Sequence, residues 1–377
     1  EIYTLSLHDA LPISSWDLTQ LAHIGLAMIG EGEVNYKGYR LPSAEAQKKA
    51  GLEPVVLGPK DALALVSSSA YSAGVAALVF KEIEELADMG DIITSLSLEG
   101  LNGNTSPLEP EVLEARGLEG QIQSAARMRA YLEGSDIYDT YPGKPVQDPL
   151  CFRGAAYVNG SLRDALAYAA KYLDNQMNSS DDNPCLLLEE QRIVSNSNFE
   201  TTTLATAMEM LAIVLSHVSR MSCYRMIRFA NPVLTHLPRF LSHDGGESHC
   251  FGAIQKGFAS LDTEIRHLAN PCSMDYLSLA GSIEDHTTTR RSSHNICARS
   301  CMTFSISMVW SSFTRVRPLN FASWMAASHK ALGRPKPTRH FGRQCPFTRT
   351  TDRWRQTSKR PLSFQLEIGR ASCRERV

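Results

Sequence analysis

Long apolar runs and a dominant charge are both missing from this 377-residue sequence. Its composition is 43% hydrophobic and 21% charged, with a formal net charge of −2. That balance favours neither nucleic acid nor a membrane surface as a partner. The longest apolar run covers residues 204–218, is interrupted by Glu209, and is shorter than the roughly 20 residues that span a bilayer. It predicts a buried core helix.

Paired cysteines, metal-ligand spacing and nucleotide-binding glycine loops are also lacking. The nine Cys follow no pairing rhythm and no apolar leader opens the chain, so we expect free thiols in a reducing cytoplasm. Cys297 and Cys301 lie four residues apart, but no second ligand pair follows at zinc spacing, so no metal site is predicted. Gly30 and Gly32 precede no helix start and predict a turn.

Charge is distributed unevenly along the chain. Residues 1–289 hold 20 Lys+Arg and 37 Asp+Glu, whereas residues 290–377 hold 18 and 3. Residues 290–366 show no helical or strand period, which favours a frameshifted, disordered tail over a basic nucleic-acid arm. Residues 1–13 and 367–377 read as translated sequencing-adapter DNA and are excluded from fold prediction, as tags are. The predicted fold therefore lies in residues 14–289.

Helical spacing of apolar residues dominates residues 14–289. It predicts helices over residues 60–87, 161–178, 201–227 and 251–268, the first beginning at Pro59 and the second capped by Ser161. Turn-forming residues at 182–184, 243–246 and 270–271 separate the later helices. Long helices joined by such turns indicate an all-α, elongated multi-helix bundle.

Six short segments together resemble the histidine and aromatic amino-acid (phenylalanine/tyrosine) ammonia-lyase family, and they occur in the family's order over about 270 residues. They are 17–23, 30–33, 147–153, 182–184, 198–199 and 284–286. The resemblance implies the helical fold of the ammonia-lyases, which is of the fumarase/aspartase type. It also implies that the N-terminal part of a full subunit is missing here, so the bundle is truncated.

The resemblance implies a reaction and a cofactor. The family eliminates the α-amino group of an aromatic amino acid with a methylidene-imidazolone electrophile, which forms autocatalytically from an Ala-Ser-Gly segment. The corresponding residues here are Ser14, Ser15 and Trp16. Ser15 is the cyclising serine, but Trp16 replaces the glycine that lets the backbone fold back without a Cβ in the way. Electrophile formation is therefore in question.

Other family positions also differ. Ser67 replaces the family's catalytic asparagine, Leu150 a tyrosine, and Ile283 a glutamine. The family's lid tyrosine would lie upstream of residue 14.

The matching substrate-binding positions are kept. Arg153 resembles the arginine that binds the substrate carboxylate, for which a planar guanidinium is suited; the alternative is a surface salt bridge. Glu284 resembles the glutamate that faces the substrate side chain, against a plain helix-surface charge. Asn198 resembles the carboxylate-side asparagine, against a helix cap, and Gln147 a hydrogen-bonding site residue.

Three functions follow from this resemblance. The leading one is an amine lyase acting on histidine or a similar aromatic amino acid. The alternative is an electrophile-independent elimination of trimethylamine from a histidine betaine, the ergothionase type. The third is an inactive fragment of the lyase fold. In each case we expect a cytoplasmic homotetramer that binds a small amino-acid substrate and neither nucleic acid nor membrane, because the family builds its active sites from several subunits.

Overall fold

A computed structural model describes residues 2–4, 17–139, 144–236, 238–242, 247, 249, 252–276, 278 and 280–286. Three predictions lie outside these residues: the electrophile segment 14–16, the turn at 243–246 and the tail from residue 290. The strand β1 (Ile2–Thr4) pairs with β2 (Glu33–Tyr36), with Ile2 opposite Tyr36. It falls within residues 1–13, which were left out of the predicted fold.

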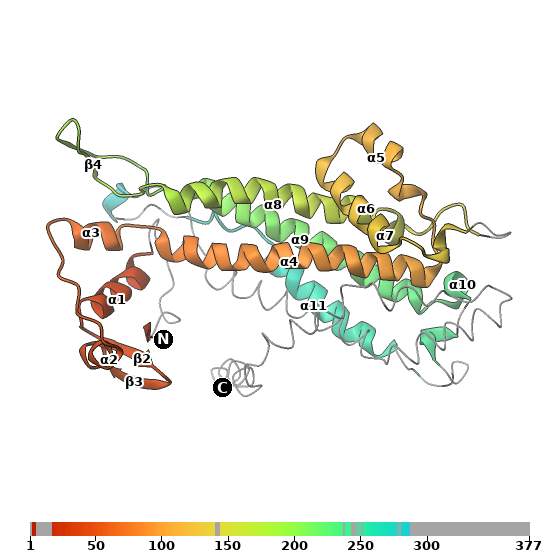
Figure 1. Ribbon diagram of the computed structural model, residues 1–377, viewed down its shortest axis with the longest axis horizontal. Coiled ribbons are helices and arrows are strands. Elements are labelled where there is room, and N and C mark those ends of the chain that lie inside the picture. Colours follow the sequence, from red (N-terminus) through yellow and green to blue (C-terminus); the bar gives the residue numbers. More distant parts are fainter. Residues whose placement is uncertain are drawn as a thin grey trace.

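Three long helices run side by side and form the body of the molecule (Figure 1). They are α4 (Ala70–Leu101), α8 (Ala155–Asn178) and α9 (Thr202–Phe229). Each presents a stripe of apolar side chains at helical spacing, and the stripes meet in one core cluster that includes Ile83, Leu162 and Leu211. The elongated all-α bundle predicted from the sequence is confirmed.

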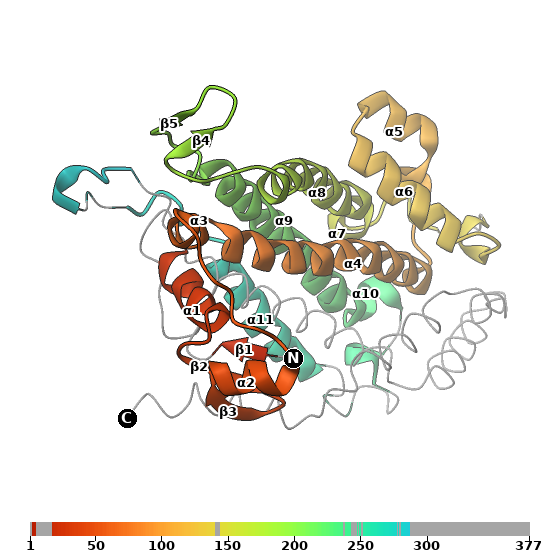
Figure 2. The ribbon, with the colours of Figure 1, turned by 60° about the vertical axis from the view of Figure 1, so that its left-hand side comes forward.

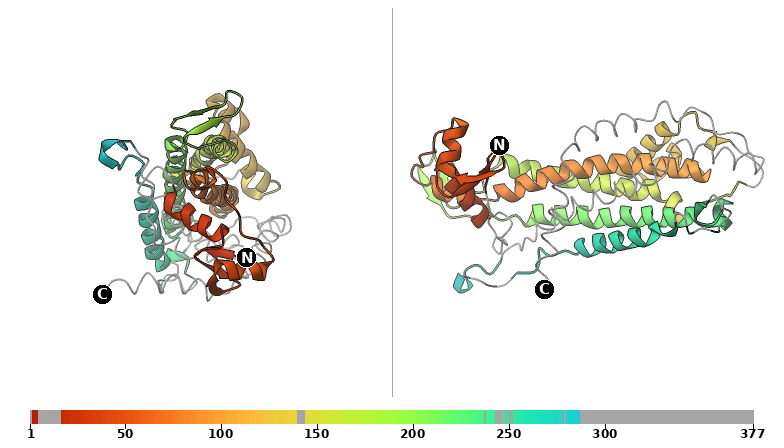
Figure 3. Two further views of the ribbon diagram at one scale, coloured as in Figure 1. Left: turned by 90° about the vertical axis from the view of Figure 1, so that its left-hand side faces the viewer. Right: turned by 90° about the horizontal axis from the view of Figure 1, so that it is seen from below.

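Two further helices extend this body. Helix α11 (Ile254–Leu268) lies along α9 (Figure 3), and its Asp262 accepts a hydrogen bond from Ser219 (3.0 Å) and pairs with Arg220 (2.6 Å). Helix α6 (Glu119–Tyr131) crosses α8 at very close range. A Cβ on Gly120 would stand 2.1 Å from the Gly160 carbonyl oxygen, so only glycine permits this approach.

Small elements cover the two ends of the bundle. At one end lie α1 (Leu18–Met28), β2 with β3 (Tyr39–Pro42), α2 (Ser43–Ala50) and α3 (Asp61–Val66). The hairpin of β4 (Cys185–Leu187) and β5 (Arg192–Val194) projects from the same end, on the other side of α4 from α1 and α2 (Figure 2). At the other lie η1 (Ser106–Leu108), α5 (Pro110–Arg116), η2 (Asp136–Tyr138), α7 (Leu150–Arg153), α10 (Pro232–Thr235) and η3 (Arg239–Leu241). A short turn, η5 (Ala280–Ser282), follows α11.

The predicted helices need two corrections. Residues 60–87 are not one helix, because the chain leaves the helix at Ser67 and restarts at Ala70, and the second helix continues to Leu101. Helix α8 begins at Ala155, six residues before Ser161. Ser161 is therefore no cap; its hydroxyl donates to the Tyr157 carbonyl (3.1 Å) within the helix. The helices predicted at 201–227 and 251–268 are confirmed to within a few residues.

Two segments, residues 61–101 and 202–229, are long and apolar enough to cross a bilayer by length and composition alone. Both contribute side chains to the buried core cluster of the bundle. The core helix predicted from the apolar run at 204–218 is thus α9.

Candidate active site

The first group of predicted site residues surrounds the break between α3 and α4. Ser67 ends α3 and is 2% exposed, and its backbone N–H donates to the Leu63 carbonyl (2.8 Å). Ser69 N–H donates to a carboxylate oxygen of Asp181 (2.7 Å), which lies beyond the far end of α8. The carboxylate satisfies backbone donors at the helix start, which fixes the loop that carries Ser67.

Asp17 ties the electrophile position to the same loop. It follows residue 16 directly and is fully buried. Its carboxylate accepts from the Ser72 backbone N–H (2.7 Å) and hydroxyl (2.6 Å), and its own N–H donates to the Ser68 carbonyl (3.2 Å). The electrophile segment, Ser14 to Trp16, lies outside the described residues. The next residue in the chain, Asp17, lies beside the loop of residues 67–69.

Asparagines line the turn that follows α8. The Asn183 side chain accepts from Asn196 N–H (3.0 Å), and the Asn196 side chain accepts from Asn198 N–H (2.8 Å). An ion pair between Lys60 and Asp182 joins this turn to the start of α3. Asn198 is therefore at the same end of the bundle as Ser67, with its side chain exposed.

Glu284 belongs to this end as well. His286 lies 3.9 Å from a carboxylate oxygen of Glu200, which precedes α9, and its ring packs edge-on against Tyr276. Glu284, two residues earlier in the chain, is partly buried. Ser67, Asn198, Glu284 and the segment before Asp17 are thus gathered at one end of the bundle.

Gln147 and Arg153 lie at the opposite end. The Arg153 guanidinium on α7 donates to the Gln147 side-chain oxygen, and both residues are exposed. Asp148 between them is buried and accepts from Asn104 N–H (2.6 Å). Burial raises the pKa of Asp148. The segment is therefore anchored inward by Asp148 while its two predicted substrate-binding side chains face outward.

The length of α8 gives the distance between the residues around Ser67 and the pair at Arg153, because α8 begins beside Arg153 and ends just before Asp181. Its 24 residues correspond to about 36 Å at 1.5 Å per residue. A single described chain therefore brings the predicted site residues together in two sets, one at each end of the bundle (Figure 1).

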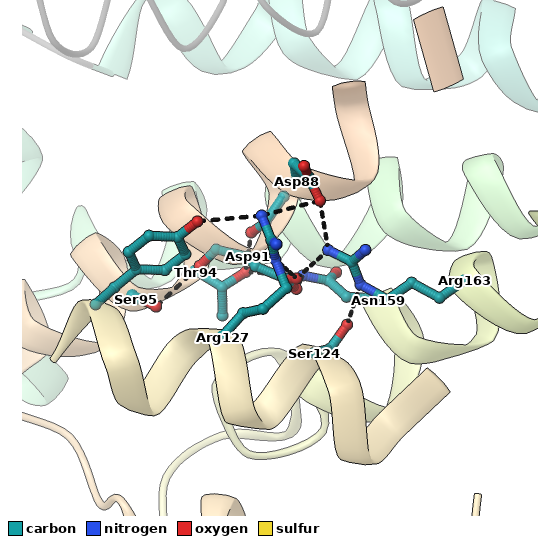
Figure 4. A network of polar contacts seen from close by, with 10 residues as sticks. Asp88, Asp91, Thr94, Ser95, Ser124, Arg127, Asn159 and Arg163 are labelled. Atoms are coloured by element: carbon teal, nitrogen blue, oxygen red, sulfur yellow. Dashed lines mark hydrogen bonds and ion pairs between the residues drawn. The ribbon is translucent and has the colours of Figure 1, made fainter. Parts of the chain in front are cut away.

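A third polar cluster, which the sequence did not predict, lies between the two ends where α4, α6 and α8 meet (Figure 4). Asp91 is 0% exposed and contacts Arg163 (2.5 Å), Arg127 (3.4 Å) and the Asn159 amide (3.1 Å). Burial raises the pKa of Asp91 although the Arg163 guanidinium opposes the shift. The signal in the sequence was Asp91, a carboxylate that lies directly before an apolar stretch of α4 at residues 92–93.

Solved structures of known proteins share this fold. A solved ergothionase from Treponema denticola, in complex with desmethyl-ergothioneine sulfonic acid, has a TM-score of 0.74 and 41% identity over 89% of this chain and 69% of its own. The solved histidine ammonia-lyase of Trypanosoma cruzi has a TM-score of 0.70 and 26% identity, over 78% of this chain and 56% of its own. The fold is therefore the helical fold shared by these two lyases.

Sequence relatives specify the family. Histidine ammonia-lyase of Stigmatella aurantiaca is 38% identical over 276 residues, which are 73% of this chain and 54% of that protein. That of Anaeromyxobacter sp. (strain K) is 34% identical over 85% of this chain and 66% of its own length. The aromatic amino acid lyase family matches residues 14–310. The chain belongs to this family and spans about half the length of the first of these curated relatives.

The family's electrophile does not fit the residues present. Asp17, the first described residue after the electrophile segment, is buried and hydrogen-bonded through both its backbone and its side chain. Trp16 places a Cβ and an indole where cyclisation uses glycine. Ser67, in the neighbouring loop, offers a hydroxyl in place of an amide.

Proposed function

We propose that the chain is part of an amine lyase that eliminates the α-amino group from histidine or a similar aromatic amino acid. Membership of the aromatic amino acid lyase family supports this, as do the histidine ammonia-lyase relatives. The observation that carries the proposal is the exposed pair formed by Arg153 on α7 and Gln147 just before it, a pair suited to binding a carboxylate and anchored by the buried Asp148.

Each proposed site residue has a chemical task. The planar guanidinium of Arg153 forms paired hydrogen bonds to the substrate carboxylate, with Gln147 and Asn198 adding polar contacts to the amino-acid end. Glu284 accepts the imidazole N–H of histidine. Elimination breaks the bond between Cα and nitrogen, removes a proton from Cβ and leaves a double bond between the two carbons. In this proposal these residues orient the substrate for elimination, and Ser15 and Ser67 are assigned to the amine end of the site because they match the family's catalytic positions.

We further propose that the active site forms between copies of the chain, in a cytoplasmic homotetramer. Arg153 and Glu284 lie at opposite ends of a bundle whose α8 alone is about 36 Å long. One amino acid cannot contact both ends of one chain. In a symmetric assembly the α7 end of one copy meets the Glu284 end of another, which completes the site.

The second candidate is elimination of trimethylamine from a histidine betaine. Three departures from the family pattern favour it, Trp16, Ser67 and Leu150, because each lies in or beside the apparatus that activates a poor leaving group. A trimethylammonium group leaves as a neutral amine without electrophilic help. The 41% identical ergothionase supports this candidate.

Parallel turnover assays on the assembled chain decide between these functions. Histidine and its trimethylbetaine are each supplied, and release of ammonia or trimethylamine is measured together with formation of the conjugated product. Release of ammonia from histidine supports the leading proposal. Turnover of the betaine alone replaces it with the second candidate. If neither is turned over, the chain is an inactive fragment of the lyase fold.

A further inference from the structure

Arg225 on α9 is a fully buried cation. Its side chain is among the largest fully enclosed ones, with 1% exposure. Its guanidinium donates to the Ser222 hydroxyl (3.0 Å) and the Cys151 backbone carbonyl (3.1 Å), while its Nε atom is buried without a hydrogen-bond acceptor among the described residues. Burial lowers the pKa of Arg225 to about 10, so the group stays charged at neutral pH.

This charge does not serve the stability of the bundle. Among the described residues, Arg225 donates to a carbonyl and a hydroxyl and forms no ion pair with a carboxylate. A buried charge without an opposite charge lowers the stability of a fold. An apolar side chain of similar length would fill the same space at lower cost. Stability therefore does not explain why an arginine occupies this position, and its hydrogen-bond partners indicate another role.

Of its two hydrogen bonds, one stays within α9 at Ser222 and the other reaches the short helix α7 at Cys151. The Cys151 carbonyl lies two residues before Arg153, on a helix of only four residues. Beside it, Phe152 packs edge-on against Phe229 of α9, with ring centroids 5.6 Å apart. A single-turn helix has few internal hydrogen bonds of its own, so its orientation depends on what grips it from outside.

We propose that Arg225 is a positioning residue that holds α7 by the Cys151 carbonyl and thereby aims the Arg153 guanidinium at the substrate carboxylate. The inference rests on the proposed role of Arg153 in carboxylate binding. It assigns to α9 a second task besides core packing. Asp148 grips the same segment from the α4 side through Asn104, so α7 is fixed from both flanks.

The test measures binding and does not depend on turnover. Histidine and histidinamide, which lacks the carboxylate, are titrated calorimetrically into the assembled chain and into its Arg225→Met variant. In Arg225→Met the hydrogen bond from Arg225 to the Cys151 carbonyl is lost, and we expect histidine to bind about tenfold more weakly. The affinity for histidinamide should stay within about twofold of that of the unmodified chain. Arg228→Met removes an exposed arginine from the same helix and should leave both affinities unchanged. Arg225→Lys, which keeps one charged donor, should restore part of the histidine affinity.

A double variant separates positioning from a structural role. In an Arg153→Lys background, Arg225→Met should have almost no further effect on histidine binding, because both changes act through one contact. Equal losses in both backgrounds, or equal losses for histidine and histidinamide, overturn the proposal while leaving the proposed function intact. If Arg153→Lys alone leaves histidine affinity unchanged, the carboxylate role of Arg153 fails first, and this inference with it. If neither Arg225 variant assembles, Arg225 serves the fold and the proposal is wrong.

Discussion

Arg153 is the side chain on which the proposed chemistry depends most. It is exposed on α7 and already shares a hydrogen bond with Gln147, so its guanidinium is oriented before substrate arrives. A planar fork that is oriented in advance loses less entropy on binding a carboxylate than a flexible ammonium does. Shape therefore contributes as much as charge at this position.

Replacing Arg153 with lysine tests that statement. The charge is kept but the paired geometry is lost, so we expect substrate binding to weaken by about 1.5–3 kcal/mol, measured as the ratio of dissociation constants. Arg192→Lys changes an exposed arginine at the opposite end of the bundle and should have no effect. Unchanged affinity in the Arg153→Lys variant would show that another cation binds the carboxylate.

Trp16 leads to a spectroscopic prediction. Because an indole occupies the position of the cyclising glycine, we expect the purified chain to lack the near-ultraviolet absorbance of a methylidene-imidazolone and to keep any activity in cyanide. A histidine ammonia-lyase relative treated in the same way is the positive control. Cyanide-sensitive deamination of histidine by this chain would restore the family's ordinary mechanism and remove the betaine candidate.

At the scale of elements, the junction of α4, α6 and α8 concentrates charge within an apolar bundle. Asp91 and Asp88 lie nearly one turn apart on α4 and contact the same two arginines, yet the Asp91 side chain is 0% exposed and that of Asp88 is 49% exposed. Coulomb energies are screened at the surface and stronger in the interior. The two carboxylates therefore differ in environment and not in partners.

This matched pair predicts two very different stability changes. Asp91→Ala leaves Arg163 partly buried without its closest carboxylate and should lower the free energy of unfolding by about 3–5 kcal/mol. Asp88→Ala removes a half-exposed carboxylate and should lower it by about 0–1 kcal/mol. Urea unfolding followed by circular dichroism measures both. Equal changes in the two variants would mean that burial does not govern this cluster.

Elements also show how far the sequence predicts the fold. Apolar spacing located α8, α9 and α11 because each buries one continuous stripe, which local sequence records. It missed the break at residues 67–69, since that break depends on Asp181, more than 100 residues away in the chain. It missed the true start of α8 because Ser161 has the chemistry of a cap but sits one and a half turns inside the helix. A contact distant in sequence thus determines the first of these boundaries.

The sequence motifs name candidate site residues but do not predict how those residues are arranged in space. The resemblance located the residues at each end of the bundle, but nothing in their spacing says that Arg153 and Glu284 end up on opposite sides of a long helix. The burial of Arg225 could not be predicted from the sequence for a different reason. An arginine on a helix is normally an exposed residue, and only the packing of α7 against α9 reveals that this one is enclosed.

At the scale of the whole molecule, the two-ended arrangement predicts that function depends on concentration. A site shared between copies exists only in the assembly, whereas each bundle has its own core. When the chain is diluted below the dissociation constant of the assembly, the amount of histidine bound per chain should fall. The helical circular dichroism signal should stay constant. Sedimentation velocity at the same concentrations supplies the control. Binding that persists in monomers would contradict the shared site.

The separation of Arg153 from Glu284 along α8 has a genetic consequence. A chain with a lesion at Arg153 still carries an intact Glu284 end, and a chain with a lesion at Glu284 still carries an intact α7. When the two defective alleles are expressed together, mixed assemblies contain some sites built from both sound ends, alongside sites that carry both lesions. From the proposed shared site we therefore expect two inactive gene copies to complement one another in the same cell, with the share of recovered sites reporting how the copies are arranged.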